Sequence, residues 1–300
     1  MLKIAHCPIY SHPLPEGHRF PMVKYELIPE QLIHEGTCTR EHFFCPEQLD
    51  EKWILGVHDK DYWLSLKNGT AAPKMIRRIG FPLSPQLVER ETVIAQGTID
   101  CCHFAKRFGV AMNVAGGTHH AFPGRGEGFC LLNDIGIAAN YLLEMKLAKR
   151  ILVIDLDVHQ GNGTAAMFRN EARVFTFSMH GKDNYPLHKE QSDLDIPLET
   201  GTSDEIYLNK LSDNLSGLFE THRPDFVFYL SGVDILKTDK LGHLAVSREG
   251  CRQRDEYVFD QCRQRNLPVV VSMGGGYSPR LTDLVEAHCN TFRVAQKLYF

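Results

Sequence analysis

The most constraining feature of this chain is an apolar run that ends in ionisable residues. Residues 151–164 read Ile-Leu-Val-Ile-Asp-Leu-Asp-Val-His-Gln-Gly-Asn-Gly-Thr. The β-branched first half predicts a strand that is buried on both faces, as in a parallel sheet. Open α/β sheets bind ligands beyond the carboxyl ends of their strands, which is where Asp155, Asp157 and His159 stand. Alternation along an extended chain would place these three side chains on one side.

The rest of the chain alternates predicted strands with predicted helices. Strands are expected at 3–7, 110–114, 173–179, 225–230 and 268–272 and in the apolar run that begins at 151, with a further short one within 37–45. Helices are expected at 22–34, 47–55, 59–67, 86–108, 132–146, 163–168, 203–221 and 247–265, and from 279 to the terminus. Residues 68–85 are interpreted as a basic loop punctuated by Gly and Pro. This order predicts one α/β domain over residues 1–300, with a central, mostly parallel sheet and helices on both faces.

Composition narrows the class of protein. A net charge of −4 over 300 residues, without a long basic run, argues against direct nucleic-acid binding. The N-terminus lacks the apolar core of a signal peptide, and no apolar run approaches the length of a membrane span. Nine cysteines without a Cys-x-x-Cys motif predict reduced thiols in a cytoplasmic protein rather than a disulfide framework.

Three residues at strand ends form a candidate metal site. Asp157, His159 and Asp234 offer two oxygens and one nitrogen, and three protein ligands with an open fourth position are typical of catalytic zinc. The alternative is that each carboxylate only caps a turn or helix. A second metal is disfavoured, because Gly161 stands where a binuclear site of related architecture would need another carboxylate.

A histidine pair follows the predicted strand at 110–114. In a loop, both His119 and His120 could face one pocket, where one imidazole takes a proton from an activated water and the other supplies one to a leaving amine. Each imidazole needs an orienting partner on its other nitrogen, and Asp155 and Asn162 are the candidates. The alternative is that the pair is incidental.

Two aromatic residues stand next to glycines. Tyr277 follows three glycines after the strand at 268–272, so its hydroxyl could stabilise the oxyanion of a tetrahedral intermediate. Phe129, after Gly128, could form the wall of a narrow channel. Packing in the core is the alternative for both rings. The proline-rich loop at 11–21, with Arg19, is either a solvated connector or the rim of the site.

In combination these motifs resemble the histone deacetylase family, whose members have the arginase/deacetylase fold. The resemblance covers nearly the whole chain. It rests on Gly-Gly-Thr-His119-His120-Ala, Gly128-Phe129-Cys130 with Asn133-Asp134, Asp155-Leu-Asp157-Val-His159-Gln-Gly-Asn162-Gly, Asp234 and Gly-Gly-Gly-Tyr277. The His-Gln-Gly-Asn-Gly form is similar to class IV and related bacterial members.

The resemblance implies a set of ligands and roles. It implies zinc on Asp157, His159 and Asp234, proton transfer by His119 and His120 with Asp155 and Asn162 behind them, and Tyr277 as the oxyanion donor. It also implies that Phe129 and Gly128 line an acyl-lysine channel. A structural potassium ion is implied on Asp155, Ser178 and the backbone of Asp157, His159 and Met179.

The implied activity is a zinc-dependent removal of an acetyl or longer acyl group from an acylated lysine or a related amine. The sequence departs from the class I pattern at two places. Asn162 stands where class I enzymes have Asp. Gly80-Phe81-Pro82, which follows Arg77 and Arg78, stands where those enzymes have an Asp at the rim of the site. An acetylpolyamine or another small acylated amine is therefore an alternative to a peptide. An arginase-like manganese hydrolase and a non-catalytic acyl-lysine binding module are the other hypotheses. The oligomeric state is left open.

Overall fold

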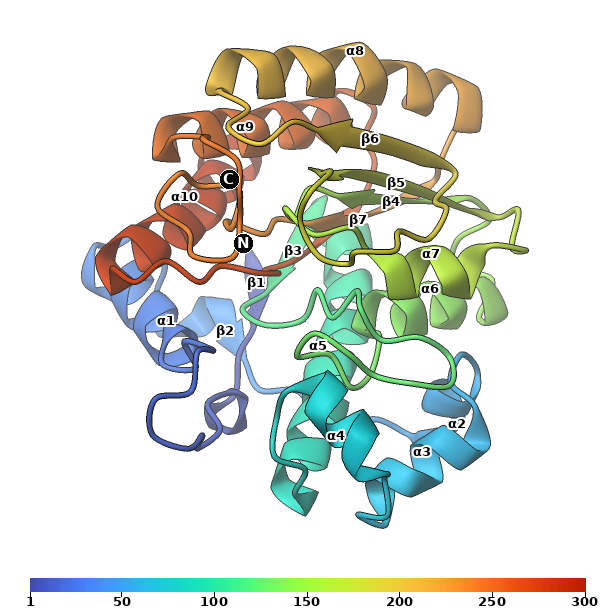
Figure 1. Cartoon of the computed structure of the whole chain (residues 1–300). Coiled ribbons are helices and arrows are strands. Elements are labelled where there is room, and N and C mark those ends of the chain that lie inside the picture. Colours follow the sequence, from blue (N-terminus) through green and yellow to red (C-terminus); the bar gives the residue numbers. More distant parts are fainter.

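The structure, a computed structural model that describes residues 1–300, is built on eight strands. They are β1 (Lys3–Ala5), β2 (Phe43–Phe44), β3 (Val110–Asn113), β4 (Ile151–Asp155), β5 (Val174–Gly181), β6 (Leu194–Leu198), β7 (Phe226–Leu230) and β8 (Val269–Ser272). All pair in parallel, in the order β2-β1-β3-β8-β7-β4-β5-β6 (Figure 1). The predicted α/β architecture with a parallel sheet is confirmed.

Ten α-helices and two 3-10 turns surround the sheet. They are α1 (Lys24–His34), α2 (Glu51–Leu55), α3 (Lys60–Lys67), α4 (Pro73–Ile79), α5 (Pro85–Phe108), α6 (Asp134–Glu144), α7 (Asn162–Phe168), α8 (Asp204–His222), α9 (Arg248–Gln264) and α10 (Leu281–Tyr299), with the turns at Pro8–Tyr10 and Arg40–His42. Helices α5, α6 and α7 cover one face of the sheet, and α1, α8, α9 and α10 cover the other (Figure 1). Helices on both faces follow from the crossover connections that parallel strands require.

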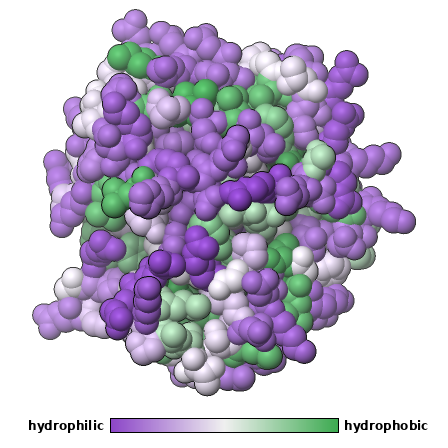
Figure 2. All heavy atoms as spheres, turned by 45° about the vertical axis from the view of Figure 1, so that its right-hand side comes forward, coloured by the Kyte–Doolittle hydropathy of each residue, from purple (hydrophilic) through white to green (hydrophobic).

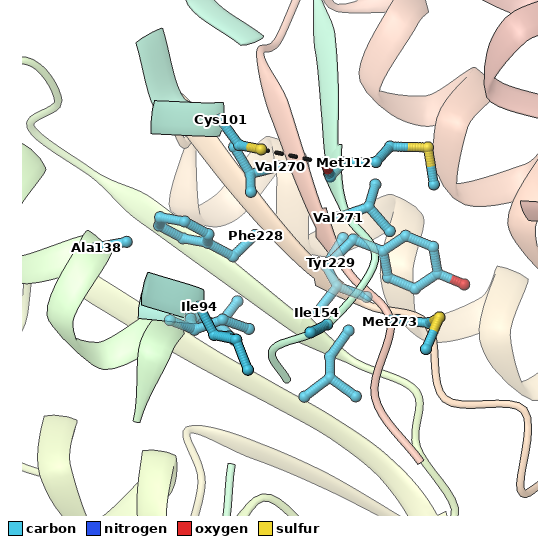
Figure 3. Packing of buried hydrophobic residues seen from close by; sticks show 14 of the residues in the cluster. Ile94, Cys101, Met112, Ala138, Ile154, Phe228, Tyr229, Val270, Val271 and Met273 are labelled. Carbon is cyan, nitrogen blue, oxygen red and sulfur yellow. Dashed lines mark hydrogen bonds between the residues drawn. The ribbon is translucent and has the colours of Figure 1, made fainter. Parts of the chain in front are cut away.

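The core lies on both faces of the four central strands. Every residue of β3, β4, β7 and β8 is buried, which matches their continuous apolar sequences. Successive side chains point to opposite faces: Phe228 lies on the side of Ile94 and Ala138, whereas Tyr229 points away from them (Figure 3). The Tyr229 hydroxyl donates to Asp255 of α9 at 2.5 Å. Burial of these strands therefore holds their carboxyl ends in fixed register.

Two elements differ from the sequence-based prediction. Residues 73–79, read as part of a loop, form α4, which begins with Pro73 at its first turn and ends at Gly80 with φ of 87°. Proline at the start and a left-handed glycine at the end are the usual limits of a short helix. Strand β6 was not predicted, because Pro197 interrupts its apolar pattern. A proline is tolerated there because β6 is an edge strand.

The prediction of reduced thiols is wrong for one pair of cysteines. Cys7 and Cys45 form a disulfide across 38 residues of sequence, and the other seven cysteines are free and buried. The pairing follows from the sheet, because β1 and β2 are parallel neighbours and each cysteine lies just past the end of its strand. Local sequence carries no sign of this register.

The surface is largely polar. Hydrophilic side chains cover most of the face shown in Figure 2, and apolar residues form only small patches on it. None of the helices combines the length and the apolar composition needed to cross a membrane.

Candidate active site and metal centre

The candidate site lies where the loops that follow neighbouring central strands meet. The loop after β3 carries His119 and His120, the loop after β4 carries Asp157 and His159, the loop after β7 carries Asp234, and the loop after β8 carries Tyr277. Because these strands are adjacent and parallel, their carboxyl ends share one edge of the sheet. The parallel arrangement of the strands therefore brings together residues that are up to 158 positions apart in sequence.

Asp157, His159 and Asp234 form the buried cluster predicted as a metal site. One ligand atom from each lies within 4.8 Å of the other two. His159 Nδ1 is 3.0 Å from Asp157 Oδ1 and 3.1 Å from Asp234 Oδ2. The prediction that strand alternation aligns Asp155, Asp157 and His159 is wrong, because β4 ends at Asp155. A turn brings the other two together, with the His159 amide donating to Asp157 Oδ1 at 2.9 Å.

The charges of this cluster call for a cation. Burial, reinforced by the neighbouring Asp157 carboxylate, raises the pKa of Asp234 to about 7. Burial opposes protonation of His159, but its hydrogen bonds to the two aspartates outweigh burial and raise its pKa to about 10. The carboxylates thus bind a positive charge strongly at the point where the three ligand atoms meet. Two carboxylate oxygens and an imidazole nitrogen form a donor set that suits zinc.

The two predicted imidazoles lie side by side next to this cluster. The ring centroids of His119 and His120 are 4.1 Å apart. His119 Nδ1 is 2.7 Å from Asp155 Oδ2, and His120 Nδ1 is 2.6 Å from Asn162 Oδ1, so both orienting partners stand where the sequence predicted them. Burial disfavours the charged form of His119, but Asp155 outweighs this and raises its pKa. Burial, with the neighbouring His119 and His159, lowers the pKa of His120 well below its usual value.

Glu127 is a buried carboxylate that sequence reasoning missed. The Asn162 side-chain amide donates to Glu127 Oε1 at 2.7 Å, and the Gly163 backbone amide donates to Asn162 Oδ1 at 3.0 Å. These two bonds fix the orientation of the Asn162 amide, so its oxygen faces His120. His120 Nδ1 must then be the donor, which leaves its Nε2 as the free acceptor. A signal existed, since Glu127 is the only acidic residue in 115–130.

Tyr277 lies against the metal cluster. Its ring centroid is 6.4 Å from that of His159 and 5.9 Å from that of Phe129. Its backbone amide donates to Asp239 Oδ2 at 2.6 Å, so Asp239, which sequence reasoning also missed, fixes the loop after β8. Burial and the nearby Asp234 raise the pKa of the phenol well above its usual value. Tyr277 therefore remains a neutral hydrogen-bond donor.

The ammonium group of Lys24 lies buried beneath the loop after β8. Lys24 Nζ donates to the Gly274 carbonyl at 3.2 Å and lies 5.8 Å from the centroid of the Tyr277 ring. Burial lowers its pKa to about 8, although Asp234 acts in the opposite direction. Its charge partly balances the two carboxylates of the cluster.

Aromatic rings line the approach to the cluster. The Phe129 centroid lies 5.2 Å from those of both Phe20 and Phe81, and Gly128 and Phe129 have φ values of 56° and 68°. A Cβ on Gly128 would stand 2.6 Å from His120 Cδ2, so only glycine fits there. Because Phe20 belongs to the loop at 11–21 and packs on Phe129, this loop belongs to the rim of the site.

Tyr185 was not predicted but shares this approach. Its ring meets that of His120 edge-on at 5.0 Å, and it lines a cavity of about 220 Å³ together with Phe129 and Tyr277. Its position, in a loop just beyond the carboxyl end of β5, was the available signal.

Three of the residues predicted to bind potassium, Asp155, Ser178 and Met179, lie on neighbouring strands of the sheet. Asp155 of β4 pairs with Ser178 of β5, and Met179 follows Ser178. Both polar side chains are buried, and Ser178 Oγ is 2.9 Å from His180 Nδ1.

Sequence comparisons identify relatives of this chain. A family model for the histone deacetylase domain matches residues 18–292. The chain is 43% identical over 296 residues to an uncharacterized protein of Picosynechococcus, covering 99% of each chain. It is 30% identical to histone deacetylase 2 of Arabidopsis thaliana, covering 87% of this chain and 70% of that protein. It is 26% identical to the acetoin utilization protein AcuC of Staphylococcus aureus, covering 88% and 73%.

One solved structure is similar over almost the whole chain. The crystal structure of the HDA15 HD domain matches with a TM-score of 0.83 at 18% identity, covering 99% of this chain and 89% of that one. At this identity the likeness establishes the fold.

Proposed function

Because the chain belongs to the histone deacetylase family, we propose that it is a zinc-dependent deacylase that removes an acetyl or longer acyl group from an acylated lysine or a related amine. The observation that carries the proposal is one buried site in which a His/Asp/Asp cluster, two oriented imidazoles and a neutral phenol adjoin. A purely structural cluster would need neither the imidazole pair nor the open approach.

Asp157, His159 and Asp234 would hold the zinc ion. When bound, zinc supplies a Lewis acid that polarises the amide carbonyl and acidifies water. The Asp234 carboxylate is fixed for this role, since its other oxygen accepts the Val158 amide at 3.0 Å. Asp157 is fixed in the same way by the Gly275 amide at 2.8 Å.

The two imidazoles would divide the proton transfers. His120, whose pKa is low, is neutral near pH 7 and can accept a proton at Nε2. Once protonated it is a strong acid, and it can deliver that proton to the leaving amine. His119, held by Asp155, favours the charged form and would stabilise negative charge in the transition state. The hydroxyl group of Tyr277 would donate a hydrogen bond to the developing oxyanion.

The alternatives differ in what they require of the site. An arginase-like binuclear site needs further carboxylates, and a Cβ at Gly161 would collide with the Asp155 carboxylate. A binding module without catalysis has no use for two oriented imidazoles. An acetylpolyamine or another small amine is compatible with the same chemistry. The potassium site and the class IV assignment remain predictions.

Hydrolysis of a fluorogenic acetyl-lysine amide tests the proposal. We expect activity that a chelator abolishes and zinc restores, with roughly one zinc bound per chain. Two manganese ions per chain would favour the arginase-like alternative. Binding of the substrate without turnover in the zinc-loaded protein would favour the binding module.

A further inference from the structure

The cavity outside the imidazole pair is lined by cations and by no carboxylate. It measures about 220 Å³, and its lining includes Arg19 and Arg78 together with Phe129, Tyr185 and Tyr277. We call Arg19 and Arg78 the cationic mouth. The whole chain has a net charge of −4, so this lining has the opposite sign to the average surface.

Arg19 is positioned by aromatic contact and keeps its hydrogen-bond donors free. Its guanidinium carbon lies 5.0 Å from the centroid of the Phe129 ring, the geometry of a cation–π contact. The side chain is exposed and takes part in no ion pair or hydrogen bond within the protein. Its loop is held on the rim by His18, whose Nε2 is 2.9 Å from the Gly80 carbonyl oxygen.

Arg78 stands at the end of α4, which is attached to the channel wall. The Gly128 amide donates to the Arg78 carbonyl at 3.1 Å, and the Phe129 amide donates to the Ile79 carbonyl at 2.7 Å. The Arg78 Nε lies 3.7 Å from Glu127 Oε2, and Arg125 Nε lies 3.6 Å from the same oxygen. One carboxylate therefore faces two guanidiniums, and an unbalanced positive charge remains.

The positive charge continues beyond Arg78 along a second depression. This groove of about 630 Å³ shares Arg78 and Tyr185 with the cavity of about 220 Å³ and is also lined by Lys74, Arg77 and Arg125. Lys74 and Arg77 are exposed and have no ionic partner. Of the two carboxylates in the groove, that of Glu190 is paired with Arg169 outside it.

We propose that the cationic mouth selects acylated amines that carry a carboxylate or phosphate group close to the scissile amide. Guanidinium groups bind such anions through paired, charge-assisted hydrogen bonds. The same field repels a polycationic substrate before it reaches the channel. The inference rests on the proposed deacylase function and specifies its substrate class. The anion can belong to an acidic peptide or to a small acylated amino acid.

The test compares substrates that share one acetyl-lysine and differ only in charge. The zinc-loaded protein is assayed on three peptides of equal length, in which the acetyl-lysine is flanked by Asp, by Ser or by Lys. A small-molecule arm compares Nε-acetyl-lysine with its carboxamide. We expect kcat/KM to be about tenfold or more higher for the Asp-flanked peptide than for the Lys-flanked one. The ratio should fall as salt rises from about 50 to about 300 mM.

Two variants assign the preference to the mouth. Arg19→Gln and Arg78→Gln should each reduce the Asp-to-Ser ratio of kcat/KM about threefold or more. The control is Arg150→Gln. Arg150 is an exposed arginine just before the amino end of β4, at the opposite edge of the sheet. It should leave the ratio unchanged.

The outcomes separate this inference from the proposed function. Turnover with no charge preference, or with a preference that survives both mouth variants, overturns the inference and leaves the deacylase function standing. If no substrate is turned over, the proposed function fails, and anisotropy with labelled peptides still tests the mouth. Tighter, salt-sensitive binding of the Asp-flanked peptide that weakens in Arg78→Gln supports it, and equal binding of all three peptides refutes it. In the small-molecule arm, a preference for the free acid over the carboxamide would show that the carboxylate of a small acylated amino acid is sufficient for recognition.

Discussion

The negative charge behind His120 can be moved closer to the imidazole by exchanging two side chains. In the native protein, Glu127 reaches His120 through the Asn162 amide, over hydrogen bonds of 2.7 and 2.6 Å. The double variant Glu127→Gln/Asn162→Asp keeps the total charge and still allows one hydrogen bond between positions 127 and 162, which the new amide would donate and the new carboxylate would accept. The negative charge moves closer to the imidazole and away from Arg78 and Arg125, which lie 3.7 and 3.6 Å from Glu127 Oε2.

The size of the effect follows from that distance. With standard bond lengths, the charge centres of the carboxylate and the imidazole are roughly 8 Å apart in the native protein and roughly 4 Å apart in the double variant. At an effective dielectric constant of about 20, its attraction for the imidazolium rises from about 2 to about 4 kcal/mol. The pKa of the His120 imidazole should therefore rise by about 1.5 units. A negative charge stabilises the protonated form, so the limb of the pH–rate profile that reports His120 moves to higher pH.

The two single variants are informative controls. In Asn162→Asp two carboxylates would face each other across the 2.7 Å contact, and they would share a proton. Little charge is then added near pH 7, and the limb should shift less than in the double variant. Glu127→Gln removes the charge, so the limb should move to lower pH.

The assay is kcat/KM against pH for the parent and the three variants, with zinc content and melting temperature measured on each. Because His119 and His120 are coupled, the observed values belong to the pair. A profile of the double variant that overlays that of the parent, with zinc and fold intact, would show that Asn162 and Glu127 do not act on His120.

Three further predictions concern the metal, the oxyanion and the fold. Asp157→Ala and Asp234→Ala should abolish activity and bound zinc, because two ligands cannot close the site, and stoichiometric zinc in either variant would remove that residue from the ligand set. Tyr277→Phe should lower turnover by about two to three orders of magnitude with unchanged zinc, whereas a loss below about tenfold would indicate a packing role. Asp134 is buried and accepts hydrogen bonds from Thr98, Thr118 and Ser272, at 2.8 to 3.0 Å. Asp134→Asn should lower the free energy of unfolding by about 2 to 4 kcal/mol, and an unchanged denaturant midpoint would contradict that role.

All strands except β6, and the functional residues that follow the central strands, could be predicted from the sequence because the relevant pattern is local. A buried parallel strand is a continuous apolar run, and the first polar residues after it must lie at the carboxyl edge of the sheet. The position of Asp155 after its apolar run was therefore sufficient to place it. The same reasoning brought together His119, Asp234 and Tyr277, although they come from three different strands.

Contacts between loops were decided only by the tertiary structure. Glu127 meets Asn162 across 35 residues, Arg19 lies on Phe129, and Cys7 bonds to Cys45. These contacts cannot be predicted from sequence periodicity, because loop residues have no alternating or helical pattern that indicates their partners.

The sequence by itself determined which reactive side chains follow the strands. The tertiary structure decided how deeply those side chains are buried and which charged groups surround them. The residue types and their places after strands are properties of short segments, which local sterics and burial fix. The protonation states of His120 and Asp234, and the charge at the mouth, depend on burial and on neighbours distant in sequence. Such electrostatic interactions exist only once the sheet has brought the loops within a few ångströms of one another.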